Sequence, residues 1–209
     1  MKIDFVSDVA CPWCAVGLNS LEIALQRLEG SIAVDIQFQP FELNPDMPAD
    51  GEDAMLHLSR KYGASAEQLA ASRQVLKERG AAVGFAFGDR NRVWNTFDAH
   101  RLLYWAGLQG RQRELKHALL KAYHTRGENP GSEDVLVHCA VEAGLDAVET
   151  RDVIQTGHYA DEVRAAEAFF QRAGIRSVPS IIINEKHLIS GGQPPEVFED
   201  ALRKIAAEQ

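Results

Sequence analysis

The chain has 209 residues, of which 45% are hydrophobic and 25% are charged. This is ordinary for a globular protein of one large domain, or of one domain with an insertion. Asp and Glu number 30 against 22 Lys and Arg, so the formal net charge is −8. Nucleic acids and anionic membranes bind clustered basic surfaces, so we expect neither as a partner. The sequence holds no apolar run long enough to span a bilayer, and its first residues lack the pattern of a secretory signal, so we expect a cytoplasmic protein.

The first forty residues predict a strand, a helix and a second strand. Residues 3–6 are mostly apolar, and residues 32–38 alternate apolar with polar side chains, as half-buried strands do. Between them Cys14 and a series of leucines recur every three or four residues, which predicts a helix that begins at Pro12 and ends at Gly30. A unit of this length favours parallel strands with a right-handed crossover.

From residue 52 to residue 173 only helical periodicity is present. Four apolar stripes, separated by glycine and proline, predict a bundle of helices. Their members are Ala99, Leu102, Leu103 and Ala106; Leu115, Leu119 and Ala122; Val135, Leu136, Cys139 and Ala140; and Ala166, Phe169, Phe170 and Ala173.

The last part of the chain returns to strands. Residues 180–183 and 187–190 predict a hairpin joined by a turn at residues 184–186. Pro194 and Pro195 then open a helix whose apolar stripe continues from Phe198 to Ile205. The order is therefore βαβ, several helices, then ββα, which indicates an α/β sheet built from both ends of the chain with a helical insertion.

Cys11 and Cys14 form a C-x-x-C unit, which in a chain with only three cysteines indicates redox chemistry or half of a zinc site. A structural zinc site needs four ligands, usually supplied by a second C-x-x-C or a close histidine pair. The sequence offers only Cys139 and scattered histidines. We therefore predict a redox pair and no metal.

The position of this pair at a helix start favours a reactive thiolate. Pro12 suits the first helical position, since its missing N–H would be unpaired there anyway. Cys11 is then the N-cap, where the free N–H groups of residues 13 and 14 and the helix dipole favour its ionised, nucleophilic form. Cys14 lies on the buried stripe and is expected to be the protonated resolving thiol.

Five separated segments resemble the FrnE-like branch of the DsbA family of thiol–disulfide oxidoreductases. They are residues 8–14 (DVACPWC), 40–45 (PFELNP), 95–101 (NTFDAHR), 177–180 (SVPS) and 190–194 (SGGQP). The resemblance implies a DsbA-like thioredoxin fold, with residues 1–50 and 174–209 forming a thioredoxin-like domain and residues 51–173 a helical insertion domain. It also implies that Pro179 is a cis-proline beside the cysteines and that the backbone of Val178 pairs with an extended substrate segment.

Several other residues have both a functional and a structural interpretation. Asp8 could relay protons to Cys14 or be a strand-end acid bonded to backbone. Trp13 could shield the disulfide and contact substrate, or only fill surface. Asn95 and His100 could line the site from the insertion and bind substrate, although a helix start explains Asn95 equally well. Cys139 is expected to be a buried apolar filler.

Three functions follow from these features. The first is a protein disulfide oxidoreductase or isomerase that acts on protein or small-molecule disulfides, exchanges electrons with a thiol redox partner and needs no cofactor beyond the Cys11–Cys14 disulfide. The second is a glutathione-dependent isomerase or transferase, related to 2-hydroxychromene-2-carboxylate isomerases and kappa-class glutathione transferases, with glutathione as co-substrate. Those enzymes generally carry Ser at the position of Cys11, so the intact pair favours the first. The third is a peptide-binding module without catalysis.

Overall fold

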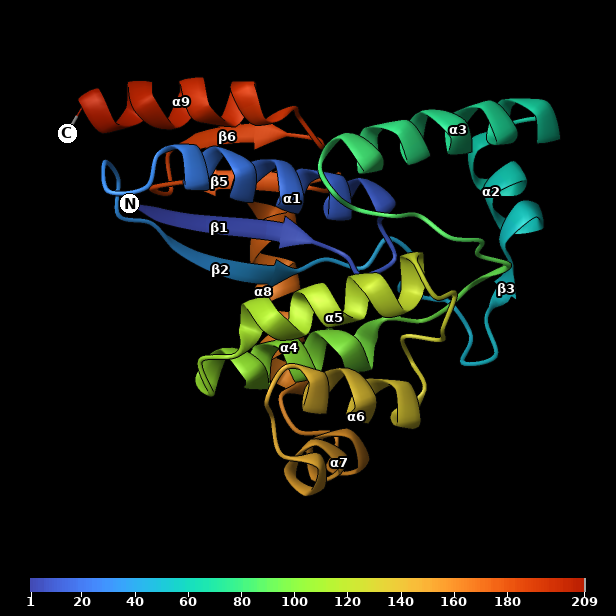
Figure 1. Cartoon of the computed structure of the whole chain (residues 1–209). Helices are drawn as coiled ribbons and strands as arrows, with labels where there is room; N and C mark the ends of the chain where they lie inside the picture. Colours follow the sequence, from blue (N-terminus) through green and yellow to red (C-terminus); the bar gives the residue numbers. More distant parts are fainter. Residues whose placement is uncertain (209) are drawn as a thin grey trace.

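The first secondary-structure elements form the predicted parallel βαβ unit. The computed structural model describes residues 1–208, and in it β1 (Lys2–Ser7) is followed by α1 (Pro12–Arg27) and β2 (Asp35–Pro40) (Figure 1). β1 and β2 pair in parallel from Lys2–Asp35 to Ser7–Pro40. The helix ends slightly before the predicted glycine and the second strand begins slightly later than predicted, because Gly30, at φ 77°, belongs to the turn between them.

The C-terminal strands complete the same sheet. β5 (Ser180–Ile183) pairs antiparallel with β1, and β6 (His187–Ser190) pairs antiparallel with β5, so the sheet order is β2-β1-β5-β6. Asn184 and Glu185 both have positive φ in the turn at residues 184–186, which Lys186 N–H closes by donating to the Ile183 carbonyl at 3.1 Å. α9 (Pro195–Ala207) follows. The predicted thioredoxin-like order, βαβ then ββα, is confirmed.

The intervening segment is mainly helical, as predicted, but not entirely so. Two-residue strands β3 (Glu52–Asp53) and β4 (Arg92–Val93) pair antiparallel and correct the expectation of helices alone; strands this short carry no detectable periodicity. The helices are α2 (Ala54–Tyr62), α3 (Ala66–Ala82), α4 (Phe97–Leu108), α5 (Gln112–His124), α6 (Glu133–Glu142), α7 (Ala147–Thr156) and α8 (Ala160–Arg172). Among residues 1–208, no helix is both long and apolar enough to cross a membrane.

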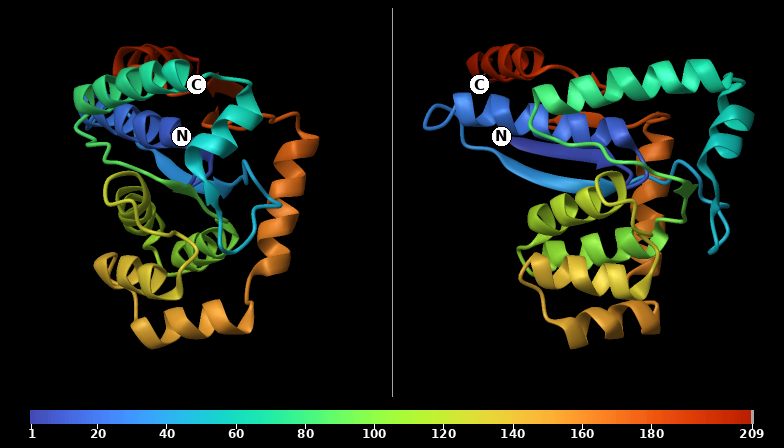
Figure 2. Two further views of the ribbon diagram at one scale, coloured as in Figure 1. Left: turned by 90° about the vertical axis from the view of Figure 1, so that its right-hand side faces the viewer. Right: turned by 45° about the vertical axis from the view of Figure 1, so that its right-hand side comes forward.

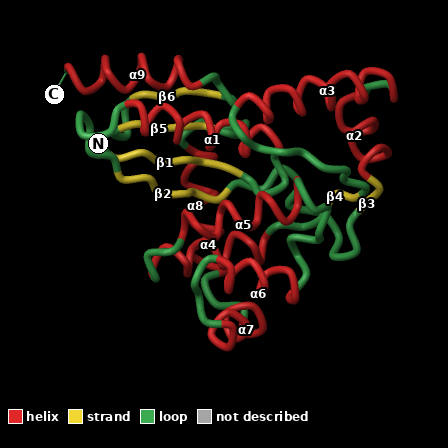
Figure 3. Tube along the Cα trace, in the orientation of Figure 1, coloured by secondary structure: helices red, strands yellow, loops and turns green. Residues whose placement is uncertain are grey.

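The helices cover the sheet from both sides (Figures 1 and 3). α1 and α9 pack together over one face, where Ile3 and Phe5 of β1 join the main hydrophobic core. Val6 points to the opposite face, where it packs with Phe170 of α8, as the period-two alternation of a strand requires. Figure 2 shows α8 running from the lower helices back to the sheet.

The lower helices α4–α7 enclose a second hydrophobic core, and this core includes Val9 and Ala10 from the turn between β1 and α1. In the other direction, Leu120 of α5 packs in the main core with both cysteines of the C-x-x-C unit. We propose that the boundaries between the thioredoxin-like domain and the helical insertion domain lie at residues 50/51 and 173/174. Residues of both domains pack together at the β1–α1 turn.

The buried face of α8 differs from the predicted stripe. Val163, Glu167 and Phe170 are buried, whereas Phe169 is largely exposed. The predicted stripe of α8 is wrong because Glu167 occupies a buried position where the apolar pattern requires an apolar residue. Apolar periodicity alone does not indicate a buried glutamate.

Gly17 allows α1 to approach the loops that carry Pro179 and Gly192. A Cβ at this position would lie 3.0 Å from Pro179 Cγ and 3.4 Å from Gly192 Cα. Both neighbours are backbone or ring atoms that cannot rotate away. The missing side chain therefore fixes how closely these loops pack beside the cysteine pair.

We expect Gly17→Val to destabilise the protein by about 1–3 kcal/mol through overpacking, measured as a lower urea midpoint with an unchanged m-value. Gly30→Ala is not a suitable control because of its positive φ, but Ala33→Val lies away from this contact. A Gly17→Val variant as stable as the wild type would contradict the close packing.

Candidate functional site

A groove opens beside the start of α1. It has a volume of about 950 Å³ and is lined mainly by apolar side chains. Cys11, Pro12 and Trp13 form one part of the wall, the segment that follows β2 and helices α2 and α3 form others, and residues 176–178 complete it. This arrangement leaves room for a peptide segment or a small organic molecule against the first cysteine.

Cys11 is the N-cap of α1, as predicted, and its backbone N–H donates to the Asp8 carbonyl at 3.2 Å. Its thiol makes no capping hydrogen bond within the described residues and instead donates to the Val178 carbonyl at 3.5 Å. The expected bonds from the first-turn amides require a thiolate, whereas a protonated thiol is a donor and turns to a carbonyl. The structure therefore places Cys11 directly against the backbone of Val178.

Cys14 lies one helical turn further on and is fully buried. Burial raises the pKa of the Cys14 thiol well above its ordinary value, and a hydrogen bond with the Cys11 side chain raises it further, while the charge of Lys116 acts in the opposite direction. The two thiols are thus adjacent, one facing the groove and the other enclosed. Cys139 is also buried, and burial raises its pKa to about 12, which is typical of an inert thiol.

Pro179 lies where the resemblance implied, with a cis peptide bond between Val178 and Pro179. Trp13 is 36% exposed at the rim of the groove. The guanidinium of Arg79, from α3, lies 6.0 Å from the Trp13 ring centroid and donates to the Gly192 carbonyl at 3.0 Å. Arg79 therefore links the helical insertion to Trp13, between the two cysteines, and to the loop at Gly192.

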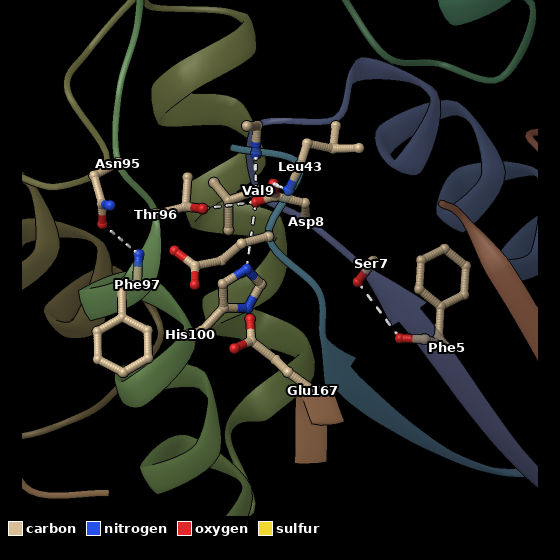
Figure 4. A network of polar contacts seen from close by, with 12 residues as sticks. Phe5, Ser7, Asp8, Val9, Leu43, Asn95, Thr96, Phe97, His100 and Glu167 are labelled. Carbon is tan, nitrogen blue, oxygen red and sulfur yellow. Dashed lines mark hydrogen bonds and ion pairs between the residues drawn. The ribbon is translucent and has the colours of Figure 1, made fainter. Parts of the chain in front are cut away.

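Asp8 is the centre of a buried polar network (Figure 4) and only 1% exposed. Its carboxylate accepts hydrogen bonds from Ala10 N at 3.0 Å, Leu43 N at 2.7 Å and Thr96 Oγ1 at 2.8 Å, and contacts His100 Nε2 at 3.3 Å. Burial tends to raise the pKa of Asp8, but the interactions with His100 and the backbone amides outweigh it, so the pKa is lowered. The carboxylate is therefore held ionised beneath the cysteine turn.

The insertion also binds the backbone of this turn. His124 Nε2, on α5, lies 2.8 Å from the Val9 carbonyl, and Arg90 donates to the Ala10 carbonyl at 3.2 Å. Burial and the nearby charge of Arg90 lower the pKa of His124 from 6.5 to about 3. His124 is therefore a neutral donor at ordinary pH, and the loop between β1 and α1 is fixed from both sides.

Of the three residues expected to bind substrate, Val178 borders the groove that Cys11 faces, whereas Asn95 and His100 do not. His100 is buried beneath the turn against Asp8, and Asn95 accepts from Phe97 N at 2.9 Å and donates to the Met47 carbonyl at 3.2 Å (Figure 4). His100 thus acts on the site through Asp8, and Asn95 shapes the entry to α4. Direct substrate contact by either residue has no geometric support in this groove.

A second ionic cluster, of two buried glutamates and the half-exposed Arg164, lies next to His100. Arg164 donates to Glu42 and, at 2.9 Å, to Glu167, and its guanidinium lies 3.7 Å from the Phe97 ring centroid. Burial raises the pKa of both glutamates. Glu42 lies within a segment that the sequence had singled out, but Glu167 and Arg164 were not expected.

Lys116 of α5 was also missed, although it is fully buried. It lies between Leu115 and Leu119 of the predicted apolar stripe, and a lysine at that place on a buried helix face was a signal that could have been used. Among residues 1–208, no set of His, Cys, Asp and Glu side chains is grouped as a metal site would require.

Comparison with known proteins identifies the family. The profile of the family described as "DSBA-like thioredoxin domain" matches residues 2–203. The chain belongs to this family. The DsbA-like chain is 37% identical to a probable DsbA oxidoreductase from Streptomyces coelicolor, and the two structures superpose with a TM-score of 0.93. The match covers 100% of this chain and 91% of the Streptomyces chain.

One further relative and one further structural neighbour of the DsbA-like chain are informative. The uncharacterized protein YwbO of Bacillus subtilis is 28% identical over 97% of this chain and 96% of its own. The cytosolic disulfide reductase DsbM of Pseudomonas aeruginosa, solved with GSH, has a TM-score of 0.68 and 16% identity, covering 99% of this chain and 100% of its own. The last likeness concerns the fold alone.

The neutral state of His124 makes stability pH-dependent. The pKa of His124 is lower in the folded protein than in the unfolded chain, so the unfolded chain binds more protons between pH 6.5 and about 3. The contribution of His124 to the free energy of unfolding is therefore lost as the pH falls through that window. Between pH 7 and pH 5 we expect His124→Gln, which keeps an N–H donor for Val9, to lose about 2 kcal/mol less unfolding free energy than the wild type.

Urea titrations at the two pH values measure this difference. Glu42 and Glu167 are present in both proteins, so their opposite pH dependence, due to raised pKa values, cancels in the comparison. Equal losses in the two proteins would show that His124 is protonated in the folded state.

Proposed function

We propose that this DsbA-like protein is a thiol–disulfide oxidoreductase that exchanges disulfides through Cys11 and Cys14. The observation that carries the proposal is the pairing of the two thiols at the start of α1, with Cys11 facing the groove beside Val178 and Cys14 enclosed behind it. Cys11 is only 4% exposed but borders the groove, whereas Cys14 does not. An attacking sulfur at a groove wall next to an enclosed one is the arrangement that two-step exchange needs.

In the reducing direction the Cys11 thiolate attacks one sulfur of a substrate disulfide. A bond forms between Cys11 and that sulfur, and the other substrate sulfur leaves with the electron pair and takes up a proton. Cys14 then loses its proton and attacks Cys11, forming the Cys11–Cys14 disulfide and releasing the second substrate thiolate. The protein is oxidised by two electrons and the substrate is reduced by two. Oxidation of a substrate dithiol follows the same steps in reverse.

The groove supports substrates that combine an apolar body with negative charge. Four cationic residues, Lys61, Arg73, Arg90 and Arg176, border it, whereas the only carboxylate on its lining is that of Glu42, which is bonded to Arg164. This contrasts with the net charge of −8 for the chain. Peptide segments that pair with the Val178 backbone and small acidic disulfides both fit this description, and glutathione is a candidate co-substrate and redox partner, consistent with its presence in DsbM.

We further assign the chain to the FrnE-like branch of the family, on the segments around Cys11, Pro40, Asn95, Pro179 and Gly191. A cytoplasmic location accords with its low cysteine content. Pro12 and Trp13 support the pair, by starting the helix and by shielding its rim, and Asp8 supports it by holding the turn.

The role of each cysteine is testable by substitution. Cys11→Ser should reduce insulin reduction with glutathione to the uncatalysed background, because the attacking sulfur is lost. Cys14→Ser should instead accumulate a mixed disulfide at Cys11, seen as a mass increase that dithiothreitol removes. Cys139→Ser is the matched control and should retain activity, since its thiol is buried and its pKa is raised. Undiminished activity of Cys11→Ser would rule out the proposal.

The alternative, a glutathione-dependent isomerase or transferase, makes a different prediction for Cys14. Such an enzyme needs glutathione near Cys11 but no resolving thiol, so Cys14→Ala would leave its turnover intact. We expect Cys14→Ala to abolish multiple-turnover reduction of a small disulfide and to leave glutathione transfer to an electrophilic aromatic substrate at background. Retained transferase turnover in Cys14→Ala, measured alongside Cys11→Ala, would favour the alternative.

A further inference from the structure

Positive charge that no carboxylate neutralises gathers around the groove at Cys11. The cations that border the groove come from four separate segments and are Lys61, Arg73, Arg90 and Arg176. Among residues 1–208, none of these four forms a salt bridge. On other faces of the molecule, Arg27, Arg113 and Arg203 each pair with a glutamate. In a chain with a net charge of −8, the groove is therefore a positive region.

Neutral groups hold two of these cations in place. Lys61 Nζ donates to the Leu43 carbonyl and to Asn44 Oδ1, each at 2.7 Å. Arg90 donates to the Ala10 carbonyl at 3.2 Å, so its guanidinium lies against the residue that precedes Cys11. These contacts fix the direction of both side chains but leave their positive charge uncompensated.

The carboxylates nearest to the groove are engaged elsewhere. Glu42 is bonded to Arg164, on the side away from the four cations, and Asp8 is enclosed by its four hydrogen-bond partners. Asp89 borders a small neighbouring pocket, but its side chain is 96% exposed and pairs with Lys77 at 3.7 Å. The groove thus offers cationic partners to an acidic group that comes from outside.

Arg73 and Arg90 lie closest to the reacting sulfur in the lining of the site. Both border the groove and also the small pocket, whose volume is about 60 Å³, and so does Pro12, the residue that follows Cys11. The wall of the groove therefore continues from Cys11 through Pro12 to two guanidinium groups. Guanidinium binds carboxylate through paired, charge-assisted hydrogen bonds.

We propose that the groove selects protein segments in which the cysteine of the disulfide is flanked by acidic residues, with Arg73 and Arg90 as the carboxylate subsite beside Cys11. This rests on the proposed function and names the substrate class for the same exchange. The four cations are spread over separate segments, so a small anion contacts only some of them, whereas an extended acidic segment contacts more. The apolar lining between them accepts its apolar side chains. The positive field also speeds encounter with such a segment.

Peptides whose single cysteine is activated as a 2-pyridyl disulfide test this selection at the first step. The Cys11 thiolate attacks the peptide sulfur and forms the mixed disulfide, while pyridine-2-thione, an uncharged chromophore, leaves with the electron pair and takes up a proton. Three peptides of equal length carry Glu, Gln or Lys on both sides of the cysteine and differ only in charge. With the reduced wild type we expect the Glu peptide to react about tenfold faster than the Gln peptide. The Lys peptide should react more slowly than either, and added salt should reduce these differences.

Charge reversal at Arg73 tests the subsite. Arg73 is exposed on α3, and its side-chain hydrogen bond among the described residues is to Met55 Sδ. We expect Arg73→Glu to slow the Glu peptide and to speed the Lys peptide by about threefold each. A purely structural disturbance would instead slow all three peptides. Lys204→Glu, exposed on α9 and outside the groove lining, changes the net charge equally and should keep the wild-type ratios.

Arg90→Gln provides a second variant. It should lower the ratio of the Glu-peptide rate to the Gln-peptide rate, because one cation of the subsite is lost. The accompanying loss of the bond to the Ala10 carbonyl affects every peptide alike and cancels in that ratio.

Equal rates for the three peptides in the wild type would overturn the inference, and so would the same changes in Lys204→Glu as in Arg73→Glu. Glutathione activated as its 2-pyridyl disulfide is the small acidic comparison. If it reacts as fast as the Glu peptide and loses as much rate in Arg73→Glu, a small molecule and not a protein segment is the occupant, and the inference is wrong. If no peptide reacts faster with the wild type than with Cys11→Ser, the proposed function fails instead.

Discussion

The buried carboxylate of Asp8 is the interaction on which the rest of the site depends. A charge removed from water is tolerated only when it is hydrogen-bonded on all sides, and Asp8 meets this condition with two backbone amides, a hydroxyl and an imidazole. Those partners come from the turn after β1, the segment after β2 and the start of α4. One side chain thus connects the sheet, the cysteine turn and the helical insertion.

The same connection explains why the insertion is more than a lid over the groove. His124 and Arg90 bind the carbonyls of Val9 and Ala10, whose side chains also pack in the core of the lower helices. The backbone just before Cys11 is therefore fixed by residues that lie 80 or more positions further along the chain. The α5 helix, which carries His124, is thus bonded to the backbone two residues before Cys11.

The sequence was sufficient for the order of the elements that build the four-stranded sheet and for the N-cap position of Cys11, because apolar periodicity and Pro12 report local preferences that the tertiary structure here does not override. It was insufficient where a buried face contains charge. Glu167 displaced the predicted stripe of α8, and Lys116 and His124 were passed over within α5, because each is tolerated only by partners or cavities supplied from distant segments. His100 was found by resemblance, but its burial against Asp8 follows from the tertiary fold alone.

Burial of Cys14 protects the second thiol from outside oxidants, but it also opposes the ionisation that the thiol needs in order to react, since burial raises its pKa. A site of this kind works in both directions only if a proton can be removed and returned without opening the core. Asp8 is unsuited to that task, because its four hydrogen bonds hold it ionised. The insertion acts instead on the position of the buried thiol, because His124 and Arg90 hold the turn from which α1 begins, and it completes the wall of the groove.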